Sequence, residues 1–351
     1  MAAASQSLPS SAGPLVVQPM VTNLERPWAI GFLPGGKVLI TEREGELLLF
    51  DGTSAKRVKG VPRVADKGQG GLLDILVPRD FAQSKEIIFT FAKRQGRGAG
   101  TALAVGRLDT DRRLLSDVKV LFEAAPSSDD GRHFGSRVRE ARDGTLYVTI
   151  GDRGQRETAQ DLKLQQGSVI RVNRDGTIPS DNPFVNEIGA RPEIWSYGHR
   201  NPQGLAMDLK GNVWAVEHGA KGGDEINAIR KGANYGWPII AYGTHYSGAK
   251  IGEGTQKTGM EQPEFFWDPS IAPSGMMIYS GKLWPQWRGN VFVGSLKFDY
   301  IARLDGAPLK EREQIKGPET ERVRDIREAP DGSIWFISIG TGTIYRLVPE
   351  Q

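Results

Sequence analysis

The residues best suited to proton transfer at neutral pH are four histidines, and His133 has the most suggestive surroundings. It lies in the loop DDGRHFGSR, directly before a β-rich segment, and its imidazole is a candidate general base toward a hydroxyl group. Asp152, in YVTIGDRG, follows that segment, where a carboxylate could orient the imidazole. Each also has an ordinary explanation, as a turn histidine bonded to the backbone and as an Asx turn.

A second set of candidates consists of cations and amides in three short motifs. GHRNPQGLAMD places four donors, His199, Arg200, Asn201 and Gln203, in one tight turn, and VGSLKFD supplies Lys297. VRDIREAPDG supplies Arg322 and Arg324, whose spacing of two puts them on one face of a strand. Taken singly, each is most often a solvated charge. Lining one pocket, they would bind several carboxylates, with arginine providing bidentate geometry and lysine a point charge.

One segment has the oxygen donors that Ca²⁺ prefers. EHGAKGGDEIN, from Glu217 to Asn227, combines acidic residues with exposed glycine carbonyls. Without further context a plain polar hairpin is the preferred interpretation. HExxH, GxSxG, P-loop and EF-hand motifs do not occur in the chain.

The composition restricts the elements that must position these residues. With 38% hydrophobic and 25% charged residues the chain is neither disordered nor a membrane protein, and a net charge of +3 gives no reason to expect nucleic acid as a partner. No apolar run reaches the roughly 18 residues of a membrane span. The absence of cysteine excludes thiolate chemistry, and 44 glycines with 21 prolines favour an all-β fold.

An internal repeat predicts the architecture. A glycine-containing turn, a short β-rich strand and a second strand recur six times, beginning near Pro34, Lys85, Asp143, Lys210, Arg288 and Asp331. Each unit is too short to bury two faces alone, so the units are expected to pack around a common axis as a six-bladed β-propeller. Leu15 to Asn23 is predicted to close the ring as the outer strand of the last blade. A pair of β-sandwiches is the rival, but no linker divides the chain.

The prediction is therefore a single propeller domain over residues 14–351, with the long stretches between the middle units forming loops on one face. Residues 1–13 are expected to be a disordered segment. This segment has neither the basic start nor the apolar stretch of an export signal, and its Ala/Ser-rich composition suggests a remnant left after signal removal.

Taken in order, these segments resemble the soluble PQQ-dependent sugar dehydrogenases of the glucose/sorbosone dehydrogenase family, and most of all its aldose sugar dehydrogenase branch. The resemblance covers nearly the whole chain. Its strongest marks are GQGGLLDI from Gly68, HFGSR from His133, TIGDRG from Thr149, SYGHRNPQGLA from Ser196, EHG and GDEIN from Glu217, GANYGWP from Gly232, and RVRDI from Arg322.

The resemblance implies a six-bladed propeller that holds PQQ and Ca²⁺ near its axis. It implies that His133 removes the proton of the sugar C1 hydroxyl while a hydride passes to C5 of the quinone, and that Asp152 orients the imidazole. By the same comparison, PQQ would be bound by Gln69, Arg200, Asn201, Lys297, Arg322 and Arg324.

The resemblance also implies that Ca²⁺ is held by PQQ together with the backbone carbonyls of Gly219 and Ala220. By analogy with the family, a second, structural Ca²⁺ near Asp224, Glu225 and Tyr235 is a further hypothesis.

Departures from the family pattern bear on the substrate. Arg132 replaces an aspartate directly before the histidine, and Glu157 replaces a glutamine, both where sugar contacts are expected. A preference for glucose is therefore not carried over. We expect an open site that accepts several aldoses, with Gln69, Arg132 and Glu157 as contacts and Trp267 as an apolar wall for the sugar ring; a buried aromatic at a blade edge is the alternative for Trp267.

Two other functions compete with the dehydrogenase. A Ca²⁺-dependent propeller lactonase would need an axial cage of Glu, Asn and Asp side chains, whereas this chain offers Arg and Lys at the candidate positions. A non-catalytic propeller that binds protein or glycan would not need the chemistry of His133 and Asp152. Members of this family are exported, so the resemblance implies a periplasmic or secreted enzyme. It also implies transfer of electrons to an external acceptor, which the sequence does not identify.

Overall fold

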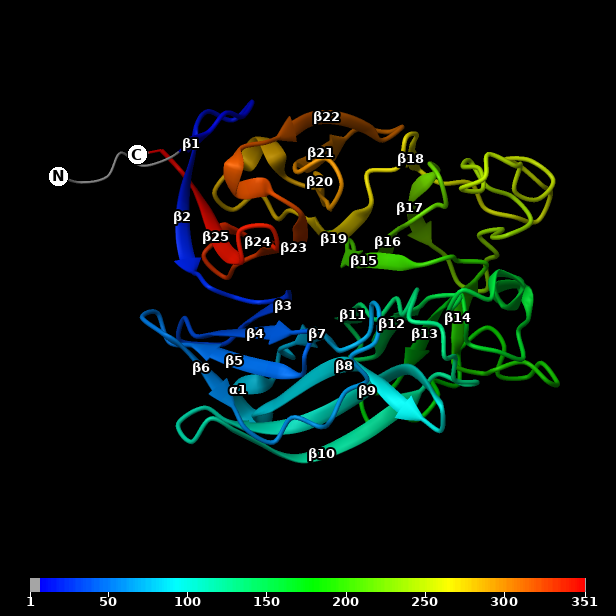
Figure 1. Cartoon of the computed structure of the whole chain (residues 1–351), viewed down its shortest axis with the longest axis horizontal. Coiled ribbons are helices and arrows are strands. Elements are labelled where there is room, and N and C mark those ends of the chain that lie inside the picture. Colours follow the sequence, from blue (N-terminus) through cyan, green and yellow to red (C-terminus); the bar gives the residue numbers. More distant parts are fainter. Residues whose placement is uncertain (1–6, 351) are drawn as a thin grey trace.

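The computed structural model describes residues 7–350, and these residues form six antiparallel sheets arranged in a ring (Figure 1). The colours of Figure 1 run around the ring in chain order, so successive blades are neighbours in space. The first strands of adjacent blades contact one another around the whole circle, from blade 1 to blade 6 and back to blade 1. The predicted all-β, six-bladed propeller is confirmed.

Blades 1 to 3 each have four strands that follow the chain from the axis outward. Blade 1 contains β3 (Pro27–Phe32), β4 (Val38–Glu42), β5 (Glu46–Phe50) and β6 (Ala55–Val58). Blade 2 contains β7 (Leu72–Leu76), β8 (Glu86–Gln95), β9 (Gly98–Asp109) and β10 (Leu114–Glu123). Blade 3 contains β11 (Val138–Glu140), β12 (Leu146–Ile150), β13 (Ser168–Val172) and β14 (Ile194–Tyr197).

Blades 4 and 5 repeat this order, and blade 6 is completed by the N-terminal segment. Blade 4 contains β15 (Pro202–Met207), β16 (Val213–Glu217), β17 (Asp224–Ile229) and β18 (Phe265–Trp267). Blade 5 contains β19 (Pro273–Ile278), β20 (Val291–Ser295), β21 (Ile301–Asp305) and β22 (Lys310–Ile315). Blade 6 contains β23 (Val323–Glu328), β24 (Ile334–Ser338), β25 (Thr343–Pro349), β2 (Leu15–Val21) and β1 (Ser7–Leu8).

The ring closes as predicted, because β2 pairs antiparallel with β25. In Figure 1 the blue N-terminal strand lies beside the red C-terminal strand. The expected disorder of residues 1–13 does not hold for the part that the structure describes. Ser7 and Leu8 pair with β2, and Leu8 is buried in the core between blades 5 and 6, because an apolar side chain there gains more from burial than the short strand loses in entropy. Residues 1–6 lie outside the described residues.

The sheets are held together by apolar clusters between neighbouring blades, one for each of the six interfaces in the described chain. Strands β4, β12, β20 and β24 are buried at every position, since a blade inside the ring is covered on both faces. The outer strand β22 alternates between exposed and partly buried residues, as expected for a strand with one solvated face.

Helical structure is minor. Over residues 7–350 it consists of α1 (Phe81–Ser84) and the 3₁₀ turns η1 (Arg156–Gln160), η2 (Pro285–Trp287) and η3 (Pro318–Thr320). None of the helices in the described part of the chain is long and apolar enough to cross a membrane.

Candidate active site

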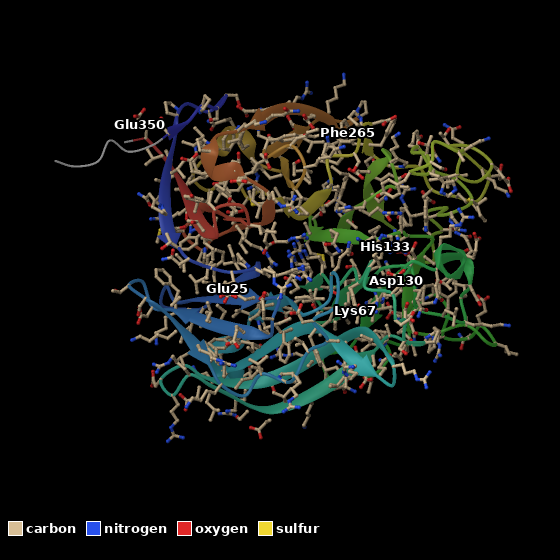
Figure 2. All side chains as sticks on the ribbon, viewed as in Figure 1. Glu25, Lys67, Asp130, His133, Phe265 and Glu350 are labelled. Atoms are coloured by element: carbon tan, nitrogen blue, oxygen red, sulfur yellow. The ribbon has the colours of Figure 1, made fainter. Side chains whose placement is uncertain are left out.

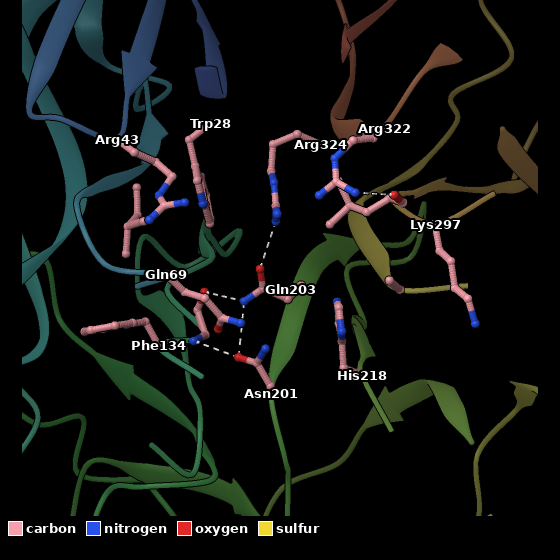
Figure 3. Close-up of a pocket in the computed structure, with 14 residues that line it drawn as sticks. Trp28, Arg43, Gln69, Phe134, Asn201, Gln203, His218, Lys297, Arg322 and Arg324 are labelled. Atoms are coloured by element: carbon pink, nitrogen blue, oxygen red, sulfur yellow. Dashed lines mark hydrogen bonds between the residues drawn. The ribbon is translucent and has the colours of Figure 1, made fainter. Parts of the chain in front are cut away.

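A cavity of about 480 Å³ opens on the face of the ring where the first strands of the blades begin and the second strands end (Figure 3). Antiparallel order places these two kinds of strand end together, so each blade contributes residues to the same mouth. The lining residues are Trp28, Arg43, Gln69, Leu73, Phe134, Gly135, Asn201, Gln203, His218, Ala272, Leu296, Lys297, Arg322 and Arg324.

The lining is strongly positive. Arg43, Lys297, Arg322 and Arg324 all face this cavity, whereas neither Asp nor Glu is among its lining residues. Lys297, Arg322 and Arg324 form no ion pair with any described carboxylate. A concave site with four cations and no internal counter-charge is built for an anionic ligand.

Arg324 is the most constrained of these cations. Its Nη1 donates to Oε1 of Gln203 at 3.0 Å, while its Nε is buried without a hydrogen-bond partner among the described residues. Burial, together with the positive charges of Arg137 and Arg43, lowers the pKa of Arg324 to about 9. A bound carboxylate would satisfy the Nε and reverse this penalty.

His133 and Asp152 meet beside this cavity, as the sequence predicts. His133 Nδ1 lies 2.6 Å from Asp152 Oδ1, and the two residues are 8% and 1% exposed. The carboxylate is held by two further donors, since its Oδ1 accepts from the backbone N–H of Gly154 at 2.8 Å and its Oδ2 accepts from Nε1 of Trp237 at 2.9 Å. Figure 2 locates His133 in the whole molecule.

This geometry determines which nitrogen of His133 can act as a base. A carboxylate at Nδ1 accepts a hydrogen bond, so the neutral ring carries its proton on Nδ1 and its lone pair on Nε2. Nε2 has no partner among the described residues. Phe134 and Gly135, the next two residues, line the cavity, so the base lies at its edge.

The loop that carries His133 is held against the cavity by side chains from three other segments. Gln69 Oε1 accepts the backbone N–H of His133 at 2.7 Å, and Asn201 Oδ1 accepts that of Gly135 at 3.1 Å. Arg153 is buried and donates to the carbonyl oxygen of Asp130 at 2.8 Å. His133 has a φ of 52°, in the left-handed region where a non-glycine residue is strained, so these contacts hold a conformation that the loop alone would leave.

Arg200, Gly219 and Ala220 lie next to the main cavity rather than on it. They line a small adjoining cavity of about 20 Å³ that shares His218 with the main one. The backbone N–H of Arg200 donates to Glu217 at 2.7 Å, and the guanidinium lies 5.4 Å from the ring of Trp237. Of the six predicted PQQ-binding residues, the main cavity therefore brings together Gln69, Asn201, Lys297, Arg322 and Arg324.

His218 lines both cavities as a neutral imidazole. Its Nε2 lies 2.6 Å from the carbonyl oxygen of Pro273, an acceptor, so Nε2 carries the proton. Burial and the charges of Arg200 and Arg324 lower the pKa of His218 to about 3. This histidine therefore adds no positive charge to the cavity at neutral pH.

The residues raised for a second Ca²⁺ have other partners. Both oxygens of Asp224 accept hydrogen bonds, from Gly219, Ser270, Ile271 and Ala272. The Tyr235 hydroxyl donates to the carbonyl oxygen of Ala228 at 2.5 Å. Burial and the facing Glu217 raise the pKa of Glu225 to about 8.

Of the residues predicted to contact sugar, Gln69 lines the cavity, whereas Arg132, Glu157 and Trp267 do not. The side chain of Arg132 is 60% exposed and pairs with Asp130 at 2.6 Å, and that of Glu157 is 76% exposed and pairs with Arg156 at 2.8 Å. Trp267 packs into the core between blades 4 and 5, and its Nε1 donates to Glu311 at 2.5 Å. The indole ring of Trp267 is buried between the two blades, so it is not available as an apolar wall for the sugar.

Three lining residues with hydrogen-bonding side chains were not assigned to the site from sequence, namely Trp28, Arg43 and His218, and Gln203 was noted only as a donor in the turn of Arg200. Arg43 and His218 directly follow the second strands of blades 1 and 4. Lys297 in blade 5 and Asp152 in blade 3 occupy the same position to within one residue. Aligning the repeats on the ends of their second strands would therefore have found both.

The ring axis is filled by paired charges. Asp74 and Asp325 are fully buried and pair with Arg137, Arg139 and Arg327. Burial alone would raise the pKa of Asp74, but the three arginines outweigh it and lower the value to about 2. The axial carboxylates are thus committed to arginines, and this arrangement does not supply the metal cage that a lactonase would need.

Comparison with known proteins agrees with this geometry. The profile of the glucose/sorbosone dehydrogenase family matches residues 24–346. The chain is 42% identical to the aldose sugar dehydrogenase YliI of Escherichia coli, over 99% of this chain and 96% of that protein.

Solved structures agree as well. The crystal structure of the soluble aldose sugar dehydrogenase from Escherichia coli in the apo form superposes with a TM-score of 0.92 at 40% identity, covering 96% of this chain and all of that one. The PQQ-bound aldose sugar dehydrogenase from Streptomyces coelicolor superposes with a TM-score of 0.80 at 27% identity, covering 97% and 99% of the two chains. The chain described here belongs to the glucose/sorbosone dehydrogenase family of oxidoreductases.

Proposed function

We propose that this enzyme oxidises aldose sugars at C1 to the lactone, using PQQ and Ca²⁺, and passes the electrons to an external acceptor. The observation that carries the proposal is the cavity with four cations and no carboxylate, next to a histidine–aspartate pair. PQQ bears three carboxylates, so its charge complements that of the cavity. Family membership and the PQQ-bound relative support the same assignment.

The residues present fit PQQ. Lys297, Arg322 and Arg324 would bind its carboxylates, and the buried, unpartnered Nε of Arg324 is a donor that such a ligand would satisfy. Arg43 is a fourth cation available for this purpose. The amide nitrogen of Asn201 has no described partner and would donate to a quinone oxygen, while Gln69 lies at the rim beside His133.

The donors near the adjoining cavity also fit Ca²⁺. Carbonyl oxygens of Gly219 and Ala220 are hard ligands of the kind Ca²⁺ takes, and Glu217 and Glu225 line the same small cavity. The Oδ1 atom of Asn227 in the neighbouring strand is buried without a partner. Gly219 and Ala220 would hold the ion, together with the cofactor.

When bound, PQQ supplies a quinone carbon, C5, that accepts a hydride, and Ca²⁺ polarises that quinone. The protein's part is to hold and move a proton. Nε2 of His133 takes the proton of the C1 hydroxyl as the C1–H bond gives up its electron pair, and the C1–O bond becomes the lactone carbonyl. Asp152 then stabilises the imidazolium through Nδ1.

The substrate range follows from the open rim. Arg132 and Glu157 are exposed, so we propose that they contribute at most outer contacts and that several aldoses are accepted. On the strength of the resemblance we also propose that the enzyme works in the periplasm or as a secreted protein.

Reconstitution tests the proposal. Metal-stripped protein is mixed with PQQ, with Ca²⁺ or with both, and dye reduction is followed with a panel of aldoses, with the H133A variant alongside. We expect sugar-dependent reduction that needs both additions and is lost in H133A. No binding at saturating PQQ would overturn the proposal, and H133A with activity near the parent would favour a non-catalytic binding module.

A further inference from the structure

The floor of the cavity rests on a buried cluster of charges at the ring axis. This axial cluster consists of Asp74, Arg137, Arg139, Asp325 and Arg327. Three arginines face two aspartates, so one positive charge is left over. Arg137 is its centre: the side chain has no exposed surface, and it pairs with Asp325 at 2.9 Å and Asp74 at 3.5 Å.

Arg137 also contacts three residues that line the cavity. Its Nε donates to the carbonyl oxygen of Gln203 at 2.6 Å, and its Nη2 donates to that of Arg324 at 3.0 Å. Its guanidinium lies 4.0 Å from the ring centre of Trp28. These three residues belong to blades 4, 6 and 1, so one buried side chain joins three separate blades beneath the ligand site.

The contacts close into a ring. The side chain of Arg324 donates to the side chain of Gln203 at 3.0 Å, and Arg137 binds the backbone carbonyls of both partners. Gln203 in turn donates to Asn201 Oδ1 and to the carbonyl oxygen of Gly135, each at 3.2 Å. Gly135 belongs to the loop of His133. Figure 3 shows the links among Arg324, Gln203 and Asn201.

Arg139 provides a natural contrast within the same cluster. Its side chain is 14% exposed, and it pairs with Asp74 at 3.2 Å and donates to the carbonyl oxygen of Val138 at 2.7 Å. No hydrogen bond links Arg139 to a lining residue within the described chain. Removing either arginine takes one positive charge from the cluster, but only Arg137 contacts the cavity wall.

We propose that Arg137 is a positioning residue that sets the spacing between the anion-binding Arg324 and the His133 loop, through the backbone of Gln203. The inference rests on the proposed function, because it concerns the same cavity. The planar guanidinium of Arg137 donates in three fixed directions, from Nε, Nη1 and Nη2, and presents its flat face to Trp28. The compact ammonium group of a lysine cannot make these contacts at once. The charge of Arg137 alone would be replaced equally well by any cation.

The test compares R137K, R137Q and R139Q in the full chain. PQQ affinity is measured by equilibrium dialysis with Ca²⁺, and kcat, KM and thermal stability are measured for the same proteins. We expect both Arg137 variants to weaken PQQ binding about 10- to 100-fold, the range typical when a residue that orients a binding group is lost. R139Q should remain within about threefold of wild type, although its melting temperature falls as that of R137Q does.

Two results would overturn the inference. If R137K binds PQQ as wild type does, the charge suffices and the fork has no role. If R139Q loses as much affinity as R137Q, the cluster acts through its net charge. Where R137Q does not fold, it is replaced by the double variant R137Q/D325N, which also removes the carboxylate that Arg137 pairs with at 2.9 Å and so restores the net charge of the cluster.

A ligand-free measurement separates this inference from the proposed function. Hydrogen exchange of the backbone amides around Gln203 and Arg324 is followed in apo R137K and R139Q. We expect faster exchange in R137K alone, and equal protection in the two variants would contradict the positioning role. If wild type binds no PQQ while R137K still shows this local loosening, the proposed function fails and Arg137 remains a positioning residue for whatever ligand the cavity takes.

Discussion

The two sides of the cavity differ in how far their polar groups are already satisfied. On the blade 3 side, Asp152 accepts three hydrogen bonds and His133 is held at both its backbone N–H and its Nδ1. On the side of blades 5 and 6, Lys297, Arg322 and Arg324 form no ion pair with a described carboxylate, and Arg324 keeps an unpartnered Nε.

This difference separates a preorganised catalytic side from a ligand-dependent one. The histidine–aspartate pair has its orientation before any ligand arrives, which is what a general base requires. Arg324 is half-buried beside Arg137, Arg43 and Arg322, so its charge carries a free-energy cost that a bound anion would relieve. Changes on the two sides should therefore affect different quantities, namely catalysis on one and affinity and apo stability on the other.

The largest effect is expected from Asp152→Asn on the preorganised side. The asparagine cannot stabilise an imidazolium, and its NH₂ group facing Nδ1 would favour the wrong tautomer of His133. We expect kcat to fall by about 10² to 10⁴ while PQQ affinity is unchanged. Steady-state kinetics with reconstituted enzyme measure this. Asp130→Asn, in the same loop and paired with Arg132, is the matched control; an equal loss in both variants would mean that the loop and not the pair is at fault.

A smaller effect of a different kind is expected from Arg324→Gln on the cationic side. Losing one charged hydrogen bond to a carboxylate should weaken PQQ binding about 10- to 100-fold. The apo protein should melt at the same or a higher temperature, because a desolvated charge among like charges has been removed. Arg312→Gln on the exposed face of the outer strand β22 is the control. A variant that binds PQQ normally but melts earlier would show that Arg324 is structural.

The same side should show a pH dependence of PQQ binding. Because the pKa of Arg324 is about 9 in the unliganded cavity, the cation is present below pH 9 and is lost above it. A tricarboxylate needs the charged form, so its dissociation constant should rise above pH 9, by up to about tenfold per pH unit. Titrations between pH 7.5 and 10 measure this. A curve that Arg324→Gln leaves unaltered would assign the titration to another group.

Much of the fold was predictable from sequence because the turns and strands of the repeats recur locally. The six repeat units coincide with the second and third strands of the six blades. The first strands were missed, since β11 is only Val138–Glu140 and β7 and β15 are buried without alternation, which leaves no period to detect. The predicted long loops therefore contain fourth and first strands as well as loops.

The candidate site was predictable where residue type carries the chemistry, as for His133, Asp152 and the cations. It was not predictable where a residue's role depends on which strands of other blades lie next to it. Arg137 and Arg139 are only two positions apart, one directly before the short strand β11 and one within it. Arg137 nevertheless contacts three cavity residues, whereas Arg139 contacts only Asp74 and a backbone carbonyl. A sequence pattern of alternating arginines does not distinguish them, because the distinction comes from strands of other blades.

The smallest effect is expected from Trp267→Phe. This variant tests whether the sugar contacts Trp267 in addition to the two sides of the cavity. Trp267 was predicted to contact the sugar, but its ring packs between blades 4 and 5 and its Nε1 is bonded to Glu311. The variant loses that bond and some packing, so the melting temperature should fall by a few degrees, while KM for aldoses stays within about twofold. Trp28→Phe, at a tryptophan that does line the cavity, is the comparison and should alter PQQ affinity more. A tenfold rise in KM for Trp267→Phe alone would mean that the sugar reaches the edge of blade 4, and that the cavity extends beyond the residues that line it in the unliganded protein.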